Sequence, residues 1–376
     1  MRPSVILGLE TSCDETSAAV VVDGRDVRAS MVSSQVDLHA RYGGIVPEIA
    51  ARAHIERIVP IIEETLAAAR MSYRDLDAVA VTIGPGLVGS LLIGVTAAKT
   101  LALTRGLPLV AVDHIEAHAT SAALVINPPP WPAVALVVSG GHTSLYLVRD
   151  FLDIELMGQT VDDAAGEAFD KVAAMLGLGY PGGPVIDRVA REGDPRAVHF
   201  PHPGLRRANF DFSFSGLKTA VLYHVFGVGR KYGSTAHLSP RQVADVAASF
   251  QAALVETLVS KTVAAARHAG VVSVVVGGGV AANSALRTAL QTACAAAGLQ
   301  LHLTPSVYCT DNAAMVASLG YQLFRRGRTA SLDLEPRAGL VRPPPRRPTR
   351  RQHSTARSVG ARSTDSPQRR RGTEKM

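Results

Sequence analysis

The sequence contains few cysteines, few aromatic residues and no long uninterrupted apolar run. Its three cysteines, Cys13, Cys294 and Cys309, are odd in number and far apart, which excludes a disulfide framework or zinc ribbon and suits a reducing compartment. No run of about 18 consecutive apolar residues occurs, so no membrane-spanning helix is expected. Residues 1–4 lead into a strand-length apolar run and not into a signal peptide. We therefore expect a cytoplasmic protein with no membrane contact.

Acidic residues are almost missing from the C-terminal end, where the positive charge is concentrated. Residues 336–376 contain 12 Lys or Arg and 2 Asp or Glu, which leaves 27 and 30 for residues 1–335, a net charge of −3 against +7 for the whole chain. This tail is rich in Arg, Pro, Ser and Thr, so we expect it to be disordered. Its charge either contributes to RNA binding or belongs to a dispensable solvated extension.

Two strand–turn–strand patterns, about 130 residues apart, predict a duplicated α/β protein. The first covers residues 5–22 and the second covers residues 133–148. Apolar strands then alternate with helices, whereas residues 194–240 are predicted to be irregular. The proline-rich segment 128–132 marks a boundary, which predicts domains at 1–127 and 133–335 before the tail at 336–376. Helices are predicted at 47–69, 91–103, 166–176, from 185 onward, and at 240–269, 283–297 and 313–324. Further strands are predicted at 76–82, 109–112, 271–276 and 299–303.

His114 and His118 are four residues apart at the start of a predicted helix. On one helix face they would present two imidazoles to a single point, as in a transition-metal site. The alternative is two unrelated histidines, one of which caps the helix. In the zinc-protease motif H-E-x-x-H the glutamate directly follows the first histidine, but here Ile115 does, and Glu116 lies about 100° further round the helix. The pair therefore offers metal ligands without a protease base.

Two glycine-rich turns, Ser139-Gly140-Gly141 and residues 277–279, follow apolar strands. Glycine lets backbone N–H groups approach a phosphate closely, although each turn alone is equally typical of a structural turn. Neither fits a P-loop or a Rossmann fingerprint. Together with the two hairpins they favour an actin-like ATPase layout, in which two related domains clamp a nucleotide. The turn at residues 84–86 is expected to serve packing.

Several acidic residues are candidates for the same cleft. Asp170 and Asp187 either accept hydrogen bonds from ribose hydroxyls or base amines, or lie on solvated helix faces. Asp311 precedes a helix, where it either caps the helix or supplies an oxygen ligand to a His-His-Asp site. Asp14 and Glu15 in the first hairpin turn are equally candidate general bases and turn-stabilising residues, so no catalytic base is assigned.

The chain resembles the tRNA N6-adenosine threonylcarbamoyltransferase family, once described as O-sialoglycoprotein endopeptidases, over roughly residues 4–335. The tail and residues 227–237 match less well. The resemblance rests on motifs in a fixed order: ETSCDET at 10–16, YGGIVPE at 42–48, HIEAH at 114–118, SGGHT at 139–143, DAAGEAFDK at 163–171, GYPGGP at 179–184, SFSGLK at 213–218, GGVAAN at 278–283 and CTDNAAM at 309–315.

The resemblance implies an α/β, actin-like (ASKHA) ATPase fold with two duplicated mixed-sheet domains around a nucleotide cleft. One divalent metal, iron or zinc, would be held by His114, His118 and Asp311. The donor would be threonylcarbamoyl-AMP, and the acceptor would be the N6 amine of the adenosine 3′ of the anticodon in tRNAs that read codons beginning with adenine. A paralogous TsaB-like subunit and a TsaE-like small ATPase would be partners. The adenylate would lie against Val137, Val138, Ser139, Gly140, Gly141, Asp170, Gly183, Asp187 and Asn283.

Such a donor is already activated, whereas an adenine amine is a poor nucleophile. The protein would therefore act mainly by positioning the reactants, which can contribute roughly 7–11 kcal/mol, and by stabilising developing negative charge. Arg206, Arg207 and Lys218 either help to dock the anticodon loop or are simply solvated. Two other functions stay open. An actin-like small-molecule kinase or ATPase without an RNA substrate would not use the histidine pair, and a non-catalytic partner subunit would not need the intact pair and Asp311.

Overall fold

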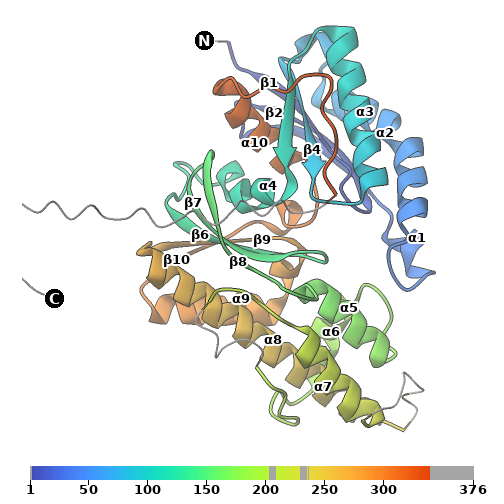
Figure 1. The fold of residues 1–376 in the computed structure, drawn as a ribbon, viewed down its shortest axis with the longest axis vertical. Coiled ribbons are helices and arrows are strands. Elements are labelled where there is room, and N and C mark those ends of the chain that lie inside the picture. The colour runs from blue at the N-terminus through green and yellow to red at the C-terminus, as the bar shows by residue number, and fades with distance from the viewer. Residues whose placement is uncertain (1, 203–208, 229–234, 236, 339–376) are drawn as a thin grey trace, which may run out of the picture. The chain divides into compact units, whose positions relative to one another are not determined.

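The computed structural model describes residues 2–202, 209–228, 235 and 237–338 of the chain. These residues belong to one compact unit, Met1–Leu340, which contains two five-stranded mixed sheets with helices packed on them (Figure 1). The predicted basic tail from residue 339 onward lies outside the described residues, as do Arg206 and Arg207. The domain boundaries predicted from the sequence stay a proposal.

The first sheet has the strand order β3-β2-β1-β4-β5. Its central strand β1 (Val5–Glu10) pairs antiparallel with β2 (Glu15–Val22), which pairs antiparallel with β3 (Asp26–Ser34). On its other side β1 pairs parallel with β4 (Ala78–Gly84), which pairs parallel with β5 (Leu109–Asp113). The strands β1 and β4 are buried along their whole length, so both faces of the sheet must be covered by other elements.

The second sheet repeats this arrangement with the order β10-β9-β6-β7-β8. Here β6 (Ala133–Val138) pairs antiparallel with β7 (Thr143–Asp150), and β7 pairs antiparallel with β8 (Asp153–Gln159). Parallel pairing joins β6 to β9 (Ser273–Gly277) and β9 to β10 (Gln300–Leu303). Both predicted hairpins and the duplicated mixed-sheet fold are therefore confirmed.

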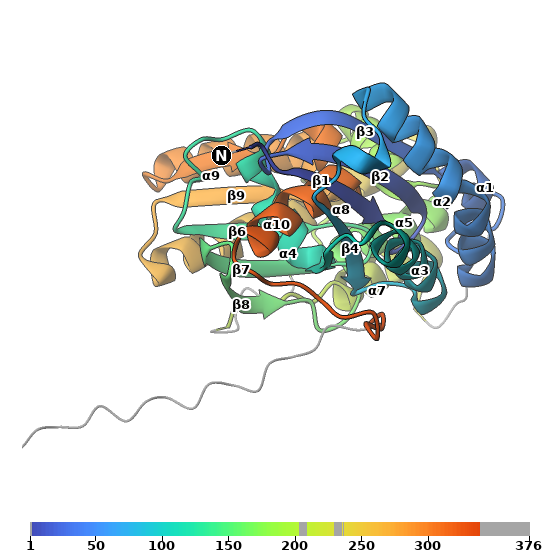
Figure 2. The same cartoon turned by 90° about the horizontal axis from the view of Figure 1, so that it is seen from above.

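Helices cover both sheets (Figures 1 and 2). The helices α2 (Pro47–Ala69) and α3 (Val88–Arg105) bury apolar side chains against one face of the first sheet, after the short helix α1 (Val36–Ala40). One large apolar core joins the second sheet to its helices. These are α5 (Ala165–Met175), α6 (Gly182–Val189), α7 (Ser215–Phe226), α8 (Pro240–Ala269) and α9 (Ser284–Ala296).

The last helix, α10 (Ala313–Arg325), returns to the first sheet and covers its second face. Gly8 on β1 permits this close approach, because a Cβ atom there would lie 2.3 Å from the Ala313 carbonyl oxygen and 2.8 Å from the Ala317 nitrogen. Two hydrogen bonds also anchor the helix. The Ala313 N–H donates to Ser17 Oγ on β2 (2.9 Å), and Ser318 Oγ donates to the Gly24 carbonyl in the turn after β2 (2.7 Å). The segment just before α10 is thereby held at the ends of β1 and β5.

The helix α4 (His114–Thr120) lies between the two sheets (Figure 2). Ile115 and Ala119 pack against the second sheet, whereas Ala117 packs in the cluster shared by the first sheet and α10. With these faces of α4 packed, His114 and His118 are fixed on the remaining face. Their position is therefore set by both halves of the molecule.

Several elements differ from the sequence prediction, among them the short helix α1, which was not predicted. The edge strands β3 and β8 were not predicted, because their side chains alternate between exposed and half-buried positions and include many polar residues. Helix α7 lies in the segment predicted to be irregular. It begins without a side-chain cap, but Leu217, Val221 and Val225 recur every four residues and are buried in the large core.

Helix α8 is long and apolar enough to cross a membrane by length and composition. However, 72% of its most apolar window is buried inside the protein, where it packs with the second sheet. It is the one such helix among the residues that the structure describes. Its hydrophobicity is accounted for by its place in the core.

Candidate metal centre and nucleotide cleft

His114, His118 and Asp311 come together between the two sheets. Asp113 begins α4 by accepting hydrogen bonds from the Ile115 and Glu116 N–H groups, so neither histidine is needed as a cap. The His118 Nε2 atom lies 3.0 Å from Asp311 Oδ1, and His114 Nε2 lies 3.5 Å from the same oxygen. Asn312, and not Asp311, caps α10 by accepting from the Met315 N–H (3.0 Å). The Asp311 carboxylate is thus left to face the two imidazoles.

This donor set fits a divalent transition metal. One ligand atom from each of the three residues lies within 4.8 Å of the others, both imidazoles are buried, and the carboxylate is 18% exposed toward the cleft. Two imidazoles and one carboxylate on one side of an ion leave open positions for substrate oxygens and suit iron(II) or zinc. Glu116 lies on the same helix but forms no hydrogen bond or ion pair with these donors in the described part of the chain.

The charges at this centre are balanced by one another. Burial alone would lower the pKa of His114, but the carboxylates of Asp311 and Glu10 raise it well above its ordinary value. Burial likewise would raise the pKa of Asp311, but His114 and His118 hold it well below its usual range. A divalent cation would bind the deprotonated forms of these same donors.

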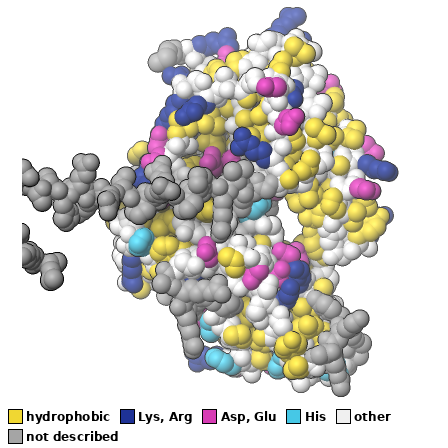
Figure 3. Space-filling model, viewed as in Figure 1, with side chains coloured by type: hydrophobic (Ala, Val, Ile, Leu, Met, Phe, Trp, Pro, Cys, Tyr) yellow, Lys and Arg dark blue, Asp and Glu magenta, His cyan; other side chains and the backbone are white. Residues whose placement is uncertain are grey.

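A cavity of about 1040 Å³ lies between the two halves, and His114 and Asp311 are part of its lining. Its lining includes the first hairpin turn from Ser12 to Glu15, the second hairpin turn from Ser139 to His142, and Asp311. In the space-filling view a notch separates the upper and lower halves, and acidic side chains gather on its lower rim (Figure 3). The volume is large enough for a nucleotide.

Most residues that the sequence predicted for the adenylate line this cavity, but their polar groups already have partners. Asp170 accepts from the Gly182 N–H (2.7 Å), and Asp187 accepts from Ser284 Oγ (2.8 Å). Asn283 caps α9 by accepting from the Leu286 N–H (2.9 Å). Each side chain therefore also fixes a helix start that borders the cleft. The predicted residues in the lining are Ser139, Gly140, Gly141, Asp170, Gly183, Asp187 and Asn283.

Val137 and Val138 are not part of the cavity lining. Both are fully buried in β6, and their side chains pack into two different apolar clusters on opposite faces of the sheet. The Val138 carbonyl oxygen lies 2.3 Å from the position that a Cβ atom on Gly278 would occupy, so this glycine serves close packing on β6. The two valines support the Ser139–Gly141 turn without facing the cavity.

The turn at Gly84-Pro85-Gly86 both packs and borders the cavity. A Cβ atom on Gly86 would lie 2.5 Å from the Ser12 carbonyl oxygen, which also accepts the Leu87 N–H (2.8 Å). Pro85, Gly86 and Leu87 nevertheless belong to the cavity lining. The turn therefore has the packing role that was expected, and it also borders the cavity.

Comparison with known proteins identifies the family. The chain matches the family model of tRNA N6-adenosine threonylcarbamoyltransferase (TsaD) over residues 26–318. A protein of that name from Symbiobacterium thermophilum is 52% identical and aligns over 90% of this chain and 97% of its own length. Another protein of that name, from Moorella thermoacetica, is 51% identical and aligns over 88% of this chain and 94% of its own length. The chain belongs to the tRNA N6-adenosine threonylcarbamoyltransferase family. Membership implies a metal ion, for which His114, His118 and Asp311 form a site.

Solved structures confirm the fold of this threonylcarbamoyltransferase family member as the actin-like ATPase fold. HypF from T. kodakarensis superimposes with a TM-score of 0.58 at 16% identity, covering 87% of this chain and 48% of HypF. The activator of 2-hydroxyisocaproyl-CoA dehydratase from Clostridium difficile was solved with bound ADPNP. It superimposes with a TM-score of 0.50 at 13% identity, covering 86% of this chain and 97% of the activator. At these identities the likeness concerns the fold alone.

Three residues at the site were not predicted from the sequence. Glu10 forms an ion pair with His114, and Lys171 lines the cavity. The ring centroids of His142 and His114 are 5.9 Å apart. Burial lowers the pKa of His142 to about 3, so its ring is neutral near pH 7. A sequence signal existed for Glu10, because it is the one charged residue in the otherwise apolar strand 5–10. A charge at such a position is expected to have a buried partner.

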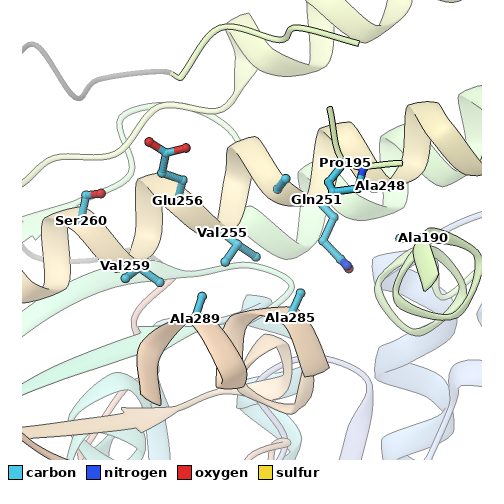
Figure 4. A pocket seen from close by; sticks show the side chains of 11 residues that line it. Ala190, Pro195, Ala248, Gln251, Val255, Glu256, Val259, Ser260, Ala285 and Ala289 are labelled. Atoms are coloured by element: carbon cyan, nitrogen blue, oxygen red, sulfur yellow. The ribbon is translucent and has the colours of Figure 1, made fainter. Parts of the chain in front are cut away.

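A second cavity of about 460 Å³ lies between α8 and α9 and differs in character (Figure 4). Val255 and Val259 of α8 point toward Ala285 and Ala289 of α9, whereas Glu256 points away from them. Glu256 is the one ionisable residue in its lining. This cavity therefore offers no chemistry comparable to that of the cleft at His114.

Proposed function

We propose that this protein transfers the threonylcarbamoyl group from threonylcarbamoyl-AMP to the N6 amine of the adenosine 3′ of the anticodon, in tRNAs that read codons beginning with adenine. Family membership over most of the chain supports the reaction. The observation that carries the proposal is the meeting of a His-His-Asp donor set and a nucleotide-sized cavity in one cleft. A small-molecule kinase would use the cavity but would leave these three donors without a role.

The resident metal in this proposal is iron or zinc, held by Nε2 of His114, Nε2 of His118 and a carboxylate oxygen of Asp311. When bound, it would supply a Lewis acid for donor oxygens. The protein contributes a rigid helix, α4, whose packing between both sheets fixes the two imidazoles before substrate enters. Such preorganisation lowers the cost of ordering the reactants.

The second half of the cleft would hold the adenylate. The space beside both glycines of the Ser139–Gly141 turn is open, since Cβ atoms on Gly140 or Gly141 would meet nothing within 4 Å. Such a turn suits the phosphate of the donor. Asp170, Gly183, Asp187 and Asn283 border the other end of the cavity, where ribose and base would lie. The mixed anhydride would then reach from the phosphate turn toward His114.

The catalytic base is left unassigned. Burial raises the pKa of Glu15 to about 10, and the carboxylates of Asp311 and Asp14 add to this effect. A carboxyl group that is protonated near pH 7 cannot accept the proton of the attacking amine. Asp14 lies beside it in the same turn, and both residues line the cavity.

Donor binding is expected to weaken as the pH falls through about 6. Burial raises the pKa of Asp170 to about 6, so this side chain is a charged acceptor above that pH and becomes protonated below it. If the carboxylate accepts hydrogen bonds from ribose, calorimetric titration with AMP between pH 5 and 8 will show an affinity that decreases toward acid. Asp170→Asn is expected to bind weakly and without this pH dependence. An unchanged pH profile in Asp170→Asn would contradict the role.

A partner surface is available on α2 and α3. The two helices approach closely, because a Cβ atom on Gly89 would lie 3.3 Å from Ala51 Cβ. Near this crossing Ile55 and Val59 are 59% and 55% exposed, and Val88 and Leu92 are each 49% exposed. Exposed aliphatic side chains clustered in this way are typical of a protein interface. We propose this surface for the paralogous TsaB-like subunit, with the TsaE-like ATPase as a further partner.

Ile55→Asp combined with Val59→Asp is expected to weaken subunit association at least tenfold while metal content stays unchanged, because a buried, unpaired charge is costly at an interface. Association is measured by sedimentation with the purified partner. Val272→Asp, which changes a residue that is 61% exposed just before β9, is the matched control and is expected to associate normally. Equal loss in both variants would contradict the assignment of this surface.

The function is tested by giving the purified protein threonylcarbamoyl-AMP and unmodified tRNA, with and without the partner subunits, and weighing the modified nucleoside. Appearance of threonylcarbamoyl-adenosine at the predicted position supports the proposal. Phosphate release with a small acceptor and no need for tRNA would instead favour the actin-like kinase. With tRNA as its substrate, the enzyme would act in the cytoplasm.

A further inference from the structure

Glu10 is a buried carboxylate next to His114, with no exposed surface. It ends the apolar strand β1, and three groups hold it there. The Ser12 N–H donates to Oε1 (2.5 Å), the Thr82 hydroxyl donates to Oε2 (2.5 Å), and His114 Nδ1 lies 3.0 Å from Oε2. Removing a carboxylate from water is costly, so an acid held in this way is expected to have a specific task.

The geometry at His114 restricts the imidazole to one arrangement. A carboxylate can only accept hydrogen bonds, so the Nδ1 atom facing Glu10 must carry a hydrogen. Nε2 then faces Asp311, at 3.5 Å from its Oδ1 atom, and its lone pair is available to a metal. The Ser12 hydroxyl, 3.3 Å from Nδ1, lies on the same side of the ring. Glu10 thus selects both the tautomer and the orientation of this ligand.

The other histidine has no such support. His118 Nδ1 is buried and has no hydrogen-bond partner among the residues that the structure describes. The orientation of the imidazole pair therefore depends on the contact between Glu10 and His114. In metal sites, a carboxylate behind a ligating histidine commonly fixes its tautomer and increases its basicity.

We propose that Glu10 is the positioning residue of the metal centre, which holds His114 with Nδ1 protonated and Nε2 directed at the ion. This inference rests on the proposed metal site at His114, His118 and Asp311. Glu10 itself touches neither the ion nor the substrate in this proposal. It acts through the ring of His114.

Glu10→Gln tests this role with almost no change in volume. The amide of glutamine can donate to Nδ1, which favours the tautomer that points a hydrogen from Nε2 at the metal position. The full-length variant is expected to bind Zn²⁺ about 10- to 100-fold more weakly than the unsubstituted protein, measured by competition with a chromophoric chelator. The absorption spectrum of the Co²⁺-substituted protein should shift as well, because the geometry around the ion changes.

Two further variants make the test decisive. Glu116→Gln removes a carboxylate that lies on α4 itself but forms no hydrogen bond or ion pair with either imidazole among the described residues. The Zn²⁺ affinity of this variant is expected to stay unchanged. Thr82→Val keeps Glu10 but removes one of its hydrogen-bond donors, so it should show a smaller loss and is informative even if Glu10→Gln does not fold. Normal Zn²⁺ affinity in folded Glu10→Gln, or equal loss in Glu116→Gln, would overturn the proposal. If the unsubstituted protein binds no metal, the metal centre itself is wrong.

Discussion

Replacing His118 with alanine is expected to remove the bound metal and, with it, transfer to tRNA. The imidazole supplies one of the three proposed donors and is fully buried. Removing a direct ligand should reduce metal affinity by more than the roughly 10- to 100-fold that follows removal of a residue hydrogen-bonded to a ligand. Metal content by mass spectrometry and transfer rate are to be measured on the same preparation.

The control is His302→Gln, which changes a half-buried histidine on the edge strand β10, outside the cavity lining. It should retain both metal and activity. Circular dichroism shows whether His118→Ala keeps its fold. A folded His118→Ala protein that transfers at the normal rate without metal would refute the proposed role of the metal centre.

Replacing Gly8 with alanine is expected to destabilise the protein strongly. The new Cβ atom would lie 2.3 Å from the Ala313 carbonyl oxygen, and backbone atoms of a packed helix cannot move aside without losing their own contacts. Overpacking of this kind lowers the free energy of unfolding by roughly 1–3 kcal/mol. Because the new atom in Gly8→Ala would meet backbone, we expect a loss at the upper end of this range or above it. Urea unfolding followed by circular dichroism measures the change in the free energy of unfolding.

Gly216→Ala is the matched control. Gly216 lies in the first turn of α7, and a Cβ atom there would meet nothing within 4 Å. It should leave stability unchanged or raise it by about 0.5–1 kcal/mol, because alanine favours a helix over glycine. If Gly8→Ala is as stable as Gly216→Ala, then α10 does not depend on close contact with β1. Metal content of Gly8→Ala should also fall, since Asp311 immediately precedes α10.

Strong local signals explain which elements were predicted well. Pro47 at the start of α2, and Ser239 with Pro240 at the start of α8, gave both helices their observed first residues. The hairpins followed from apolar runs on either side of polar turns. By contrast, α7 has no cap, and its aromatic and β-branched residues lower its helix propensity, so its burial by the surrounding core decides its structure.

The candidate site was predictable in unequal parts. The spacing of His114 and His118 on one helix indicated a shared face, and their ring centroids are 4.7 Å apart. Asp311 is 193 residues from His118 in sequence, so local pattern could offer it only as a candidate, and the family resemblance named it. Glu10 was recognisable as a buried charge but not as the partner of His114, because that pairing depends on how β1 and β5 are placed on either side of β4 in the sheet. Metal binding itself stays a prediction.

The return of α10 to the first sheet has a consequence for the order in which the protein becomes functional. A chain emerging from the ribosome makes β1, β2 and α4 early, but the carboxylate arrives only near the end of synthesis. Until then the nascent chain exposes the sheet face that α10 will cover, and neither imidazole has its Asp311 partner. A product truncated before residue 311 would therefore expose an apolar sheet face that favours aggregation. It would also lack one of the three proposed metal ligands.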